Sequence, residues 1–127
     1  LYTLIKRQLD MDKVPSEITV RKKDRTLLLV YPDNTSYEFS FEFLRVHSQS
    51  AEVKGHGPGQ SILQLNKENV MINEVQPVGN YAIKLIFDDG HDSGIYTWKY
   101  LNELGHNKNK YWQAYLDQVK ASGYTPE

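Results

Sequence analysis

The densest group of side chains able to do chemistry is the run from Asp88 to Asp92, which reads DDGHD. Its carboxylates and imidazole are of the types that bind zinc, iron or manganese. An iron site with two histidines and one carboxylate would need a second histidine, which could only be His47, His56 or His106. A calcium site is disfavoured, because the carboxylate spacing departs from that of EF-hand loops. The alternative is a hairpin turn whose Asp side chains accept hydrogen bonds from backbone amides, and we favour this interpretation because isolated acidic turns are common.

A second candidate is the glycine-rich run from Gly55 to Gly59, GHGPG, within an expected exposed loop from Ser48 to Gln60. It lacks the lysine and hydroxyl of the GxxxxGK[ST] phosphate loop and does not match GxGxxG. The favoured interpretation is a mobile loop that could serve as a docking surface, and a small-molecule site is the alternative. No serine stands in a GxSxG elbow. The sequence therefore predicts no enzyme.

Composition excludes several classes of partner. The 127 residues carry a formal net charge of -1 with a pI near 6.5, which gives no basic surface for nucleic acid. Cysteine is absent, so disulfides, thiolate catalysis and cysteine-bound metals are excluded.

No apolar run approaches the roughly 20 residues of a membrane span. The first residues lack a signal-peptide pattern. We expect a cytoplasmic protein, although the chain opens on Leu1 and could be part of a longer product.

The central stretch from Val78 to Leu104 predicts a strand, a tight turn at Asp89-Gly90, a second strand and a helix start. Its first strand should bury one face through alternating apolar residues at Tyr81, Ile83, Leu85 and Phe87. Other strands are expected at 17–21, 26–31, 37–39 and 70–75, and a short helix capped by Ser40 should follow the third of these.

The C-terminal part predicts an amphipathic helix over Tyr111–Ala121, after a polar break from Gly105 to Lys110. Its apolar stripe would consist of Tyr111, Trp112, Tyr115, Leu116 and Val119. Gly123 stands where a helix C-cap is expected.

The segment 28–44 resembles the segment 84–101, because both read strand, Asp-containing turn, strand, hydroxyl cap and aromatic-rich helix start. Two hairpin-plus-helix units around a shared core are one interpretation, and the chance likeness of two hairpins is the other. The predicted fold class is α+β and two-layer, with β-hairpins and short helices on a small sheet and a C-terminal amphipathic helix.

Several motifs together resemble one known family. They are PxxI at 15–18, FLR at 43–45, SAEVKGHGPGQ at 50–60 and DGHxSGIYxW at 89–98. The pattern is similar to the gamma-butyrobetaine hydroxylase-like N-terminal domain, most of all to its short free-standing bacterial members. The resemblance implies an extension at 1–14, this domain at 15–105, and a C-terminal helix and tail at 106–127.

In larger relatives this domain precedes the catalytic domain of iron- and 2-oxoglutarate-dependent dioxygenases, and in others it follows a P-loop ATPase that carries iron–sulfur clusters. The resemblance thus implies a non-catalytic interaction module that serves such machinery, with a P-loop iron–sulfur carrier or an iron-dependent enzyme as partner.

The dioxygenase relatives hold zinc with three cysteines and one histidine. Carried over to this sequence, those positions fall on Ser48, Ser50, Val53 and His91, so only the histidine remains. The resemblance therefore implies that the zinc site is lost and that no cofactor is bound. A histidine-based metal site of His47, His56 and His91 is the alternative.

In those relatives the segments that correspond to the glycine-rich loop and to the DDGHD turn meet at the metal, so we expect this loop and this turn to be neighbours here as well. A joint surface of Arg45, His47, His56, Asp89 and His91 is the predicted docking patch.

Overall fold

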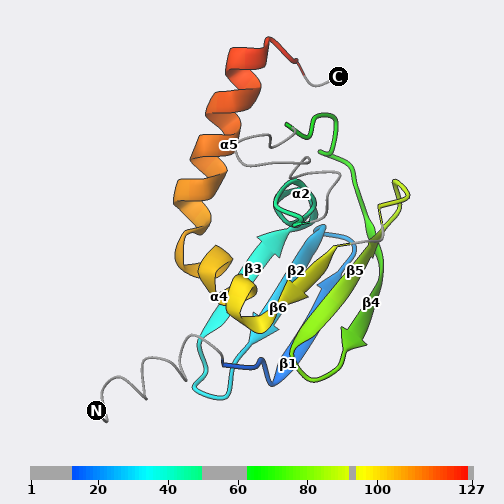
Figure 1. Ribbon diagram of the computed structural model, residues 1–127, viewed down its shortest axis with the longest axis vertical. Helices are drawn as coiled ribbons and strands as arrows, with labels where there is room; N and C mark the ends of the chain where they lie inside the picture. Colours follow the sequence, from blue (N-terminus) through cyan, green and yellow to red (C-terminus); the bar gives the residue numbers. More distant parts are fainter. Residues whose placement is uncertain (1–12, 50–62, 92–93, 126–127) are drawn as a thin grey trace.

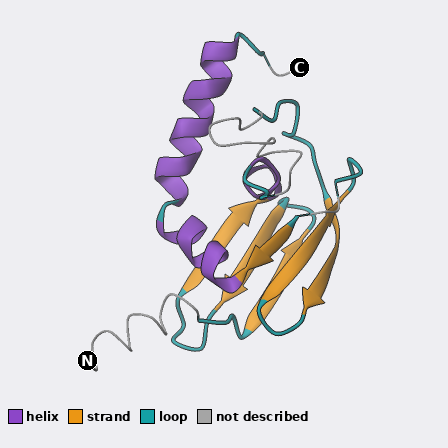
Figure 2. Cartoon of the chain, viewed as in Figure 1, coloured by secondary structure: helices purple, strands orange, loops and turns teal. Residues whose placement is uncertain are grey.

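The computed structural model describes residues 13–49, 63–91 and 94–125, which form strands and helices around a single core (Figures 1 and 2). The strands are β1 (Glu17–Arg21), β2 (Thr26–Val30), β3 (Ser36–Ser40), β4 (Ile72–Val78), β5 (Ala82–Phe87) and β6 (Ile95–Thr97). The helices are α2 (Phe41–Val46), α4 (Trp98–His106) and α5 (Lys108–Ser122). The α+β class with a C-terminal helix, predicted from the sequence, is confirmed.

The strands make two sheets of three, each an antiparallel meander, where the sequence predicted a small sheet. The first has the order β1-β2-β3 and the second the order β4-β5-β6. Leu27 pairs with Phe39 in the first sheet, and Ile83 pairs with Tyr96 at the matching place in the second. Each meander leads into a helix, α2 or α4. The two hairpin-plus-helix units expected from the sequence are therefore present.

The two units also share the hydroxyl cap at the start of their helices. The Ser40 hydroxyl accepts a hydrogen bond from the Phe43 N–H at 3.0 Å, as the sequence predicted. The Thr97 hydroxyl accepts one from the Tyr100 N–H, also at 3.0 Å. Each cap satisfies an amide that the first helical turn would otherwise leave unpaired. Both helices therefore begin directly at the end of a strand.

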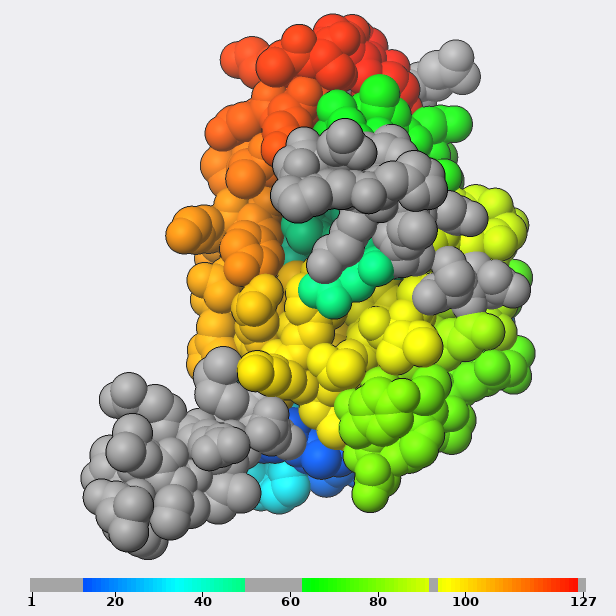
Figure 3. Space-filling view, viewed as in Figure 1, coloured from blue at the N-terminus to red at the C-terminus, as the bar shows by residue number. Residues whose placement is uncertain are grey.

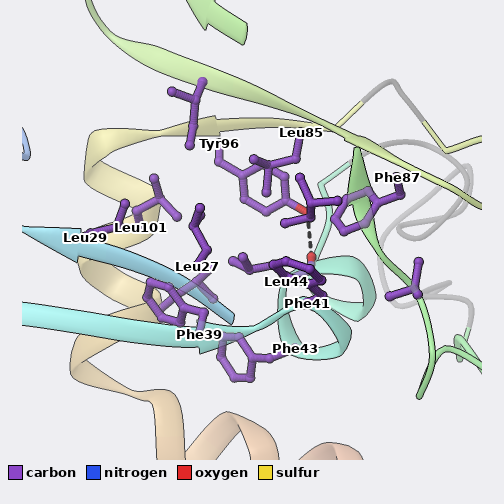
Figure 4. Packing of buried hydrophobic residues seen from close by; sticks show 14 of the residues in the cluster. Leu27, Leu29, Phe39, Phe41, Phe43, Leu44, Leu85, Phe87, Tyr96 and Leu101 are labelled. Atoms are coloured by element: carbon purple, nitrogen blue, oxygen red, sulfur yellow. Dashed lines mark hydrogen bonds between the residues drawn. The ribbon is translucent and has the colours of Figure 1, made fainter. Parts of the chain in front are cut away.

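The core lies between the two sheets, as Figure 4 shows. Leu27, Leu29 and Phe39 point from the first sheet towards Leu85 and Tyr96 of the second. All of these side chains are buried. The sequence correctly predicted burial for Ile83, Leu85 and Phe87. Tyr81 was wrongly included with them, because β5 begins only at Ala82 and the Tyr81 side chain is 53% exposed.

The end of the chain contains more helix than the sequence predicted. The expected break from Gly105 to Lys110 is wrong, since α4 continues to His106 and only Asn107 separates it from α5. Gly105 belongs to the helix for a packing reason. A Cβ atom at this position would come within 2.6 Å of the Tyr37 ring. The glycine allows α4 to lie close to β3 rather than ending the helix.

Helix α5 runs along one side of the molecule, and its C-terminal end lies beside residues 63–70 (Figures 1 and 3). Tyr115 is buried, while Tyr111 and Trp112 pack against the core. The predicted apolar stripe is too wide, because Leu116 is 40% exposed. Gly123 ends the helix with φ of +81°, which confirms the predicted C-cap.

None of the helices in the described ranges is long and apolar enough to cross a membrane.

Candidate functional site

The acidic turn between β5 and β6 is built by its own side chains. Gly90 adopts φ of +87°, and the Phe87 N–H donates to the His91 carbonyl at 3.0 Å. The Asp88 carboxylate accepts from the Met71 N–H at 3.0 Å, and the Asp89 carboxylate accepts from the His91 N–H at 3.2 Å. The turn therefore has the hydrogen bonds from backbone amides to Asp side chains that the favoured interpretation predicted.

Asp89 also ties the turn to distant parts of the chain. Its second carboxylate oxygen accepts from Arg45 Nε at 2.9 Å and from Lys67 Nζ at 2.7 Å. The Arg45 side chain is almost fully buried and donates a further hydrogen bond to Gln64 Oε1 at 3.1 Å. A buried guanidinium is stable only when paired and hydrogen-bonded, and these contacts provide both. Helix α2, residues 64–67 and the hairpin turn are thus joined at one carboxylate.

The charges around Asp89 keep it ionised. Partial burial raises the pKa of the Asp89 carboxyl group. The hydrogen bonds from Lys67 and the His91 N–H, and the charge and hydrogen bond of Arg45, outweigh this effect, so the pKa falls to about 2. At neutral pH the group holds a negative charge between two cations. Its arrangement is that of an ion-paired structural link.

A second link joins the end of helix α2 to the hairpin turn. The Ser48 hydroxyl oxygen lies 2.8 Å from Nε2 of His91, and both side chains are only 2% exposed. Gly94 lies against this pair, since a Cβ there would come within 2.8 Å of the Ser48 oxygen. A serine bonded to an imidazole is also the geometry of a nucleophile and its base. At this burial a substrate could not reach the hydroxyl, so we regard the pair as structural.

The pair does not fit zinc. Zinc–sulfur and zinc–nitrogen bonds of about 2.3 and 2.0 Å at a tetrahedral angle place two ligand atoms roughly 3.5 Å apart. Ser48 and His91 stand at the positions that the resemblance assigns to two zinc ligands, yet they bond to each other at 2.8 Å. Ser50 and Val53 lie outside the described residues. Within the described ranges, no three His, Asp or Glu side chains gather as metal ligands would.

His47 contacts different residues from His91. Its Nδ1 atom lies 2.8 Å from the Phe43 carbonyl, and its ring packs between the rings of Phe43 and Tyr111 at 4.3 and 5.9 Å. Burial lowers the pKa of His47, although the hydrogen bond to Phe43 acts in the opposite direction. A neutral imidazole in an aromatic stack is a packing element. His56 lies outside the described residues, so its place in the histidine-based site is not defined.

Of the predicted docking patch, Arg45, Asp89 and His91 are brought together, whereas His47 faces the aromatic side of α5. Arg45 and His91 are buried, so they support the turn from beneath and do not offer a surface themselves. Sequence reasoning missed Gln64 and Lys67. They lie in a polar segment without any motif, and their bonds to Arg45 and Asp89 span 19 and 22 residues.

The fold and this site define a small α+β domain in which a hairpin turn is held to the end of a helix by an ion pair and a serine–histidine hydrogen bond. The family model described as gamma-butyrobetaine hydroxylase-like, N-terminal, matches residues 18–102. The chain belongs to this family, as its motifs indicated. No protein of curated function matches it.

Solved structures agree with this assignment. Two solution NMR structures share 48% and 42% identity with the chain, with TM-scores of 0.78 and 0.76. Each match covers 91% of this chain, and 90% and 86% of the other. A crystal structure from Acidithiobacillus ferrooxidans, of a DUF971-family protein with unknown function, shares 36% identity with a TM-score of 0.59. That match covers 76% of this chain and 94% of the other. These relatives are therefore short chains, which agrees with a short free-standing member.

Proposed function

We propose that the protein is a non-catalytic interaction module. One observation carries the proposal, namely that the side chains best suited to chemistry are already bonded within the protein. Asp89 is held by Arg45 and Lys67, His91 by Ser48, and His47 by the Phe43 carbonyl. A catalytic base or a metal ligand needs an open position for its substrate or ion, whereas these groups fix one segment to another.

The surface that this network supports is the turn Asp88–Gly90 together with Lys67. Asp88 and Gly90 are exposed, and the side chains of Asp89 and Lys67 are each about one-fifth exposed. Arg45 and His91 hold the turn from the protein side. A partner would thus meet a rigid turn that carries charges of both signs. Because the turn is already held in place, it would lose little conformational entropy on binding.

The proposed partner is a P-loop iron–sulfur carrier or an iron-dependent dioxygenase, and the proposed compartment is the cytoplasm. Support for the partner comes from the domains that accompany this family in larger proteins, which is an argument by association. A net charge of -1 supports a protein partner over nucleic acid. A metal-binding role around His91 and a small-molecule role of the Gly55 to Gly59 loop are the competing proposals.

The test is direct binding between purified proteins. The chain is immobilised, and the P-loop iron–sulfur carrier and iron-dependent dioxygenases of the same genome are passed over it. We expect saturable binding of one of them. Asp88→Asn keeps the oxygen that accepts from the Met71 N–H but removes the charge, and it should weaken binding about tenfold, or about 1.4 kcal/mol.

Glu17→Gln is the matched control, because it removes one exposed carboxylate from β1, which belongs to the other sheet. It should leave binding unchanged. Equal loss in both variants would mean a nonspecific charge effect. If none of the candidates binds, the proposed partner class is wrong.

A further inference from the structure

A pocket lies between the first sheet, helix α2 and the start of α5, away from the acidic turn. Its volume is about 370 Å³. The lining residues are Thr26, Glu38, Ser40, Glu42, Phe43, Lys108, Asn109 and Trp112. Pockets of roughly 300–1,000 Å³ hold small molecules, so this one has the size for a small organic compound.

Two aromatic rings form a fixed apolar wall of this pocket. The rings of Phe43 and Trp112 lie 6.2 Å apart at an angle of 48°. Trp112 also stacks on Tyr115 at 5.3 Å, and Tyr115 is buried and donates to the Gln64 carbonyl at 2.6 Å. The indole is thus held from behind, and a ligand stem could pack on it without reorganising the wall.

Most polar groups of the pocket are already used by the protein. The Glu38 carboxylate accepts from Arg21 at 3.1 Å and from the Thr26 hydroxyl at 3.0 Å. The Lys108 ammonium donates to the Glu38 carbonyl, and the Ser40 hydroxyl accepts from the Phe43 N–H. These contacts hold β3, α2 and α5 together and leave little capacity for a ligand.

Glu42 is the exception. Within the described residues, its carboxylate makes no hydrogen bond and no ion pair, although the residue is half-buried. Burial, followed by the nearby charge of Glu68, raises the pKa of the Glu42 carboxyl group. Glu42 and Glu68 also raise the pKa of Tyr115, after its burial. A partly desolvated anion beside a second anion is unfavourable, and a cation placed next to it would remove that cost.

We propose that this pocket binds a small molecule that carries a primary ammonium group on a short apolar stem. The ammonium lies at the Glu42 carboxylate, and the stem packs on Phe43 and Trp112. A primary ammonium donates hydrogen bonds to a carboxylate and is attracted by an aromatic face. This activity is separate from the proposed docking role of the acidic turn.

Other ligand classes fit less well. An anion such as phosphate would be repelled by Glu42, while Lys108, the lysine among the described lining residues, is bound to the Glu38 carbonyl. A divalent metal ion needs several oxygen ligands, and within the described residues no such group of carboxylates is present.

The test uses phenethylamine and n-butylamine as probes, with 2-phenylethanol as the neutral analogue of the first. The chain holds two tryptophans, so its nitrogen–proton NMR spectrum has two indole signals. The Trp98 indole donates to the Asn80 carbonyl and serves as an internal reference. We expect saturable shifts of the Trp112 signal with an amine, a Kd of about 1 mM or tighter, and no response of Trp98.

Glu42→Gln keeps the side-chain shape and removes the charge, so it should weaken amine binding about tenfold or more, or about 1.4 kcal/mol. Glu74→Gln, on β4, is the control and should bind as the wild type does. The proposal is overturned if neither amine shifts the Trp112 signal, if 2-phenylethanol binds as well as the amine, or if Glu42→Gln binds the amine normally. Unchanged amide dispersion shows that the variants are folded.

Discussion

The Ser48 hydroxyl and Nε2 of His91 are hydrogen-bonded at 2.8 Å across 43 residues of sequence. Ser48 follows helix α2 of the first unit, and His91 ends the turn between β5 and β6 of the second. Their bond, together with the Arg45–Asp89 pair, connects the two halves of the domain. The Tyr96 hydroxyl adds a third connection, because it donates to the Leu44 carbonyl at the end of the core (Figure 4).

The first prediction concerns metal content. Because Ser48 and His91 bond directly and the remaining carried-over positions are serine and valine, we expect purified protein to hold no stoichiometric zinc or iron. Elemental analysis measures this, and EDTA should leave the thermal midpoint unchanged. One equivalent of metal that is lost in His91→Ala, but retained in the exposed control His106→Ala, would establish the metal-binding alternative.

The second prediction concerns pH. Asp89 has a pKa of about 2 in the folded protein against an ordinary value of 3.8. A lowered folded pKa gives stability that is fully present above about pH 4 and is lost as the pH falls from there towards 2. Asp89→Asn should therefore be less stable than the wild type at pH 7, and the difference should shrink between pH 4 and pH 2.

Urea unfolding at pH 7, 4 and 2.5 measures these free energies. Glu17→Gln removes an exposed carboxylate from β1 of the other sheet and should show no such trend against the wild type. A difference for Asp89→Asn that stays constant down to pH 2.5 would show that the ion pairs of Asp89 contribute little.

Local features of the fold could be predicted from the sequence, and long-range pairings could not. Alternation, turn residues and caps placed the hairpins, the Ser40 cap, the Gly90 turn and the Gly123 C-cap, because each of these depends on neighbouring residues. The two-sheet packing and the 44-residue link from Arg45 to Asp89 depend on contacts between distant segments. No local pattern encodes them.

The same limit applies to the candidate site. The sequence correctly placed Arg45, Asp89 and His91 together through the family resemblance, but it also placed His47 with them. The rings of Phe43 and Tyr111 hold His47 elsewhere, and Tyr111 belongs to a helix that begins 61 residues later, at Lys108. Which face of a short helix a side chain takes depends on such packing, so the sequence could not assign it.

The third prediction concerns the core. Leu85 is fully buried between the sheets, so Leu85→Ala should lower the free energy of unfolding by about 2–5 kcal/mol. Leu29 holds the matching position in the first unit and is equally buried, so Leu29→Ala should cost a similar amount. Ile95→Ala is the control on the outer side of the second sheet, where the side chain is 43% exposed, and it should cost less than about 1 kcal/mol. Urea unfolding measures the free energy of unfolding of the three variants. If all three lost the same amount of stability, Leu85 and Leu29 would not be core residues.

The fourth prediction concerns Gly105. Alanine is favoured over glycine inside a helix by about 1 kcal/mol, so helix propensity alone predicts that Gly105→Ala is stabilising. The packing predicts the opposite sign. A Cβ at this position would lie 2.6 Å from three atoms of the Tyr37 ring, one of them the ring carbon nearest the backbone, so the ring cannot simply rotate away. Overpacking of this kind costs roughly 1–3 kcal/mol, and we expect a net loss of stability.

Two further variants separate the causes. Tyr37→Leu removes the ring and should make Gly105→Ala less harmful in the double variant than in the wild type, which a double-mutant cycle of unfolding free energies measures. Ala114→Gly, at an exposed position of α5, should cost about 0.5–1 kcal/mol and gives the propensity difference without packing. If Gly105→Ala raised the thermal midpoint, α4 would not lie as close to β3 as described, and Gly105 would have no packing role.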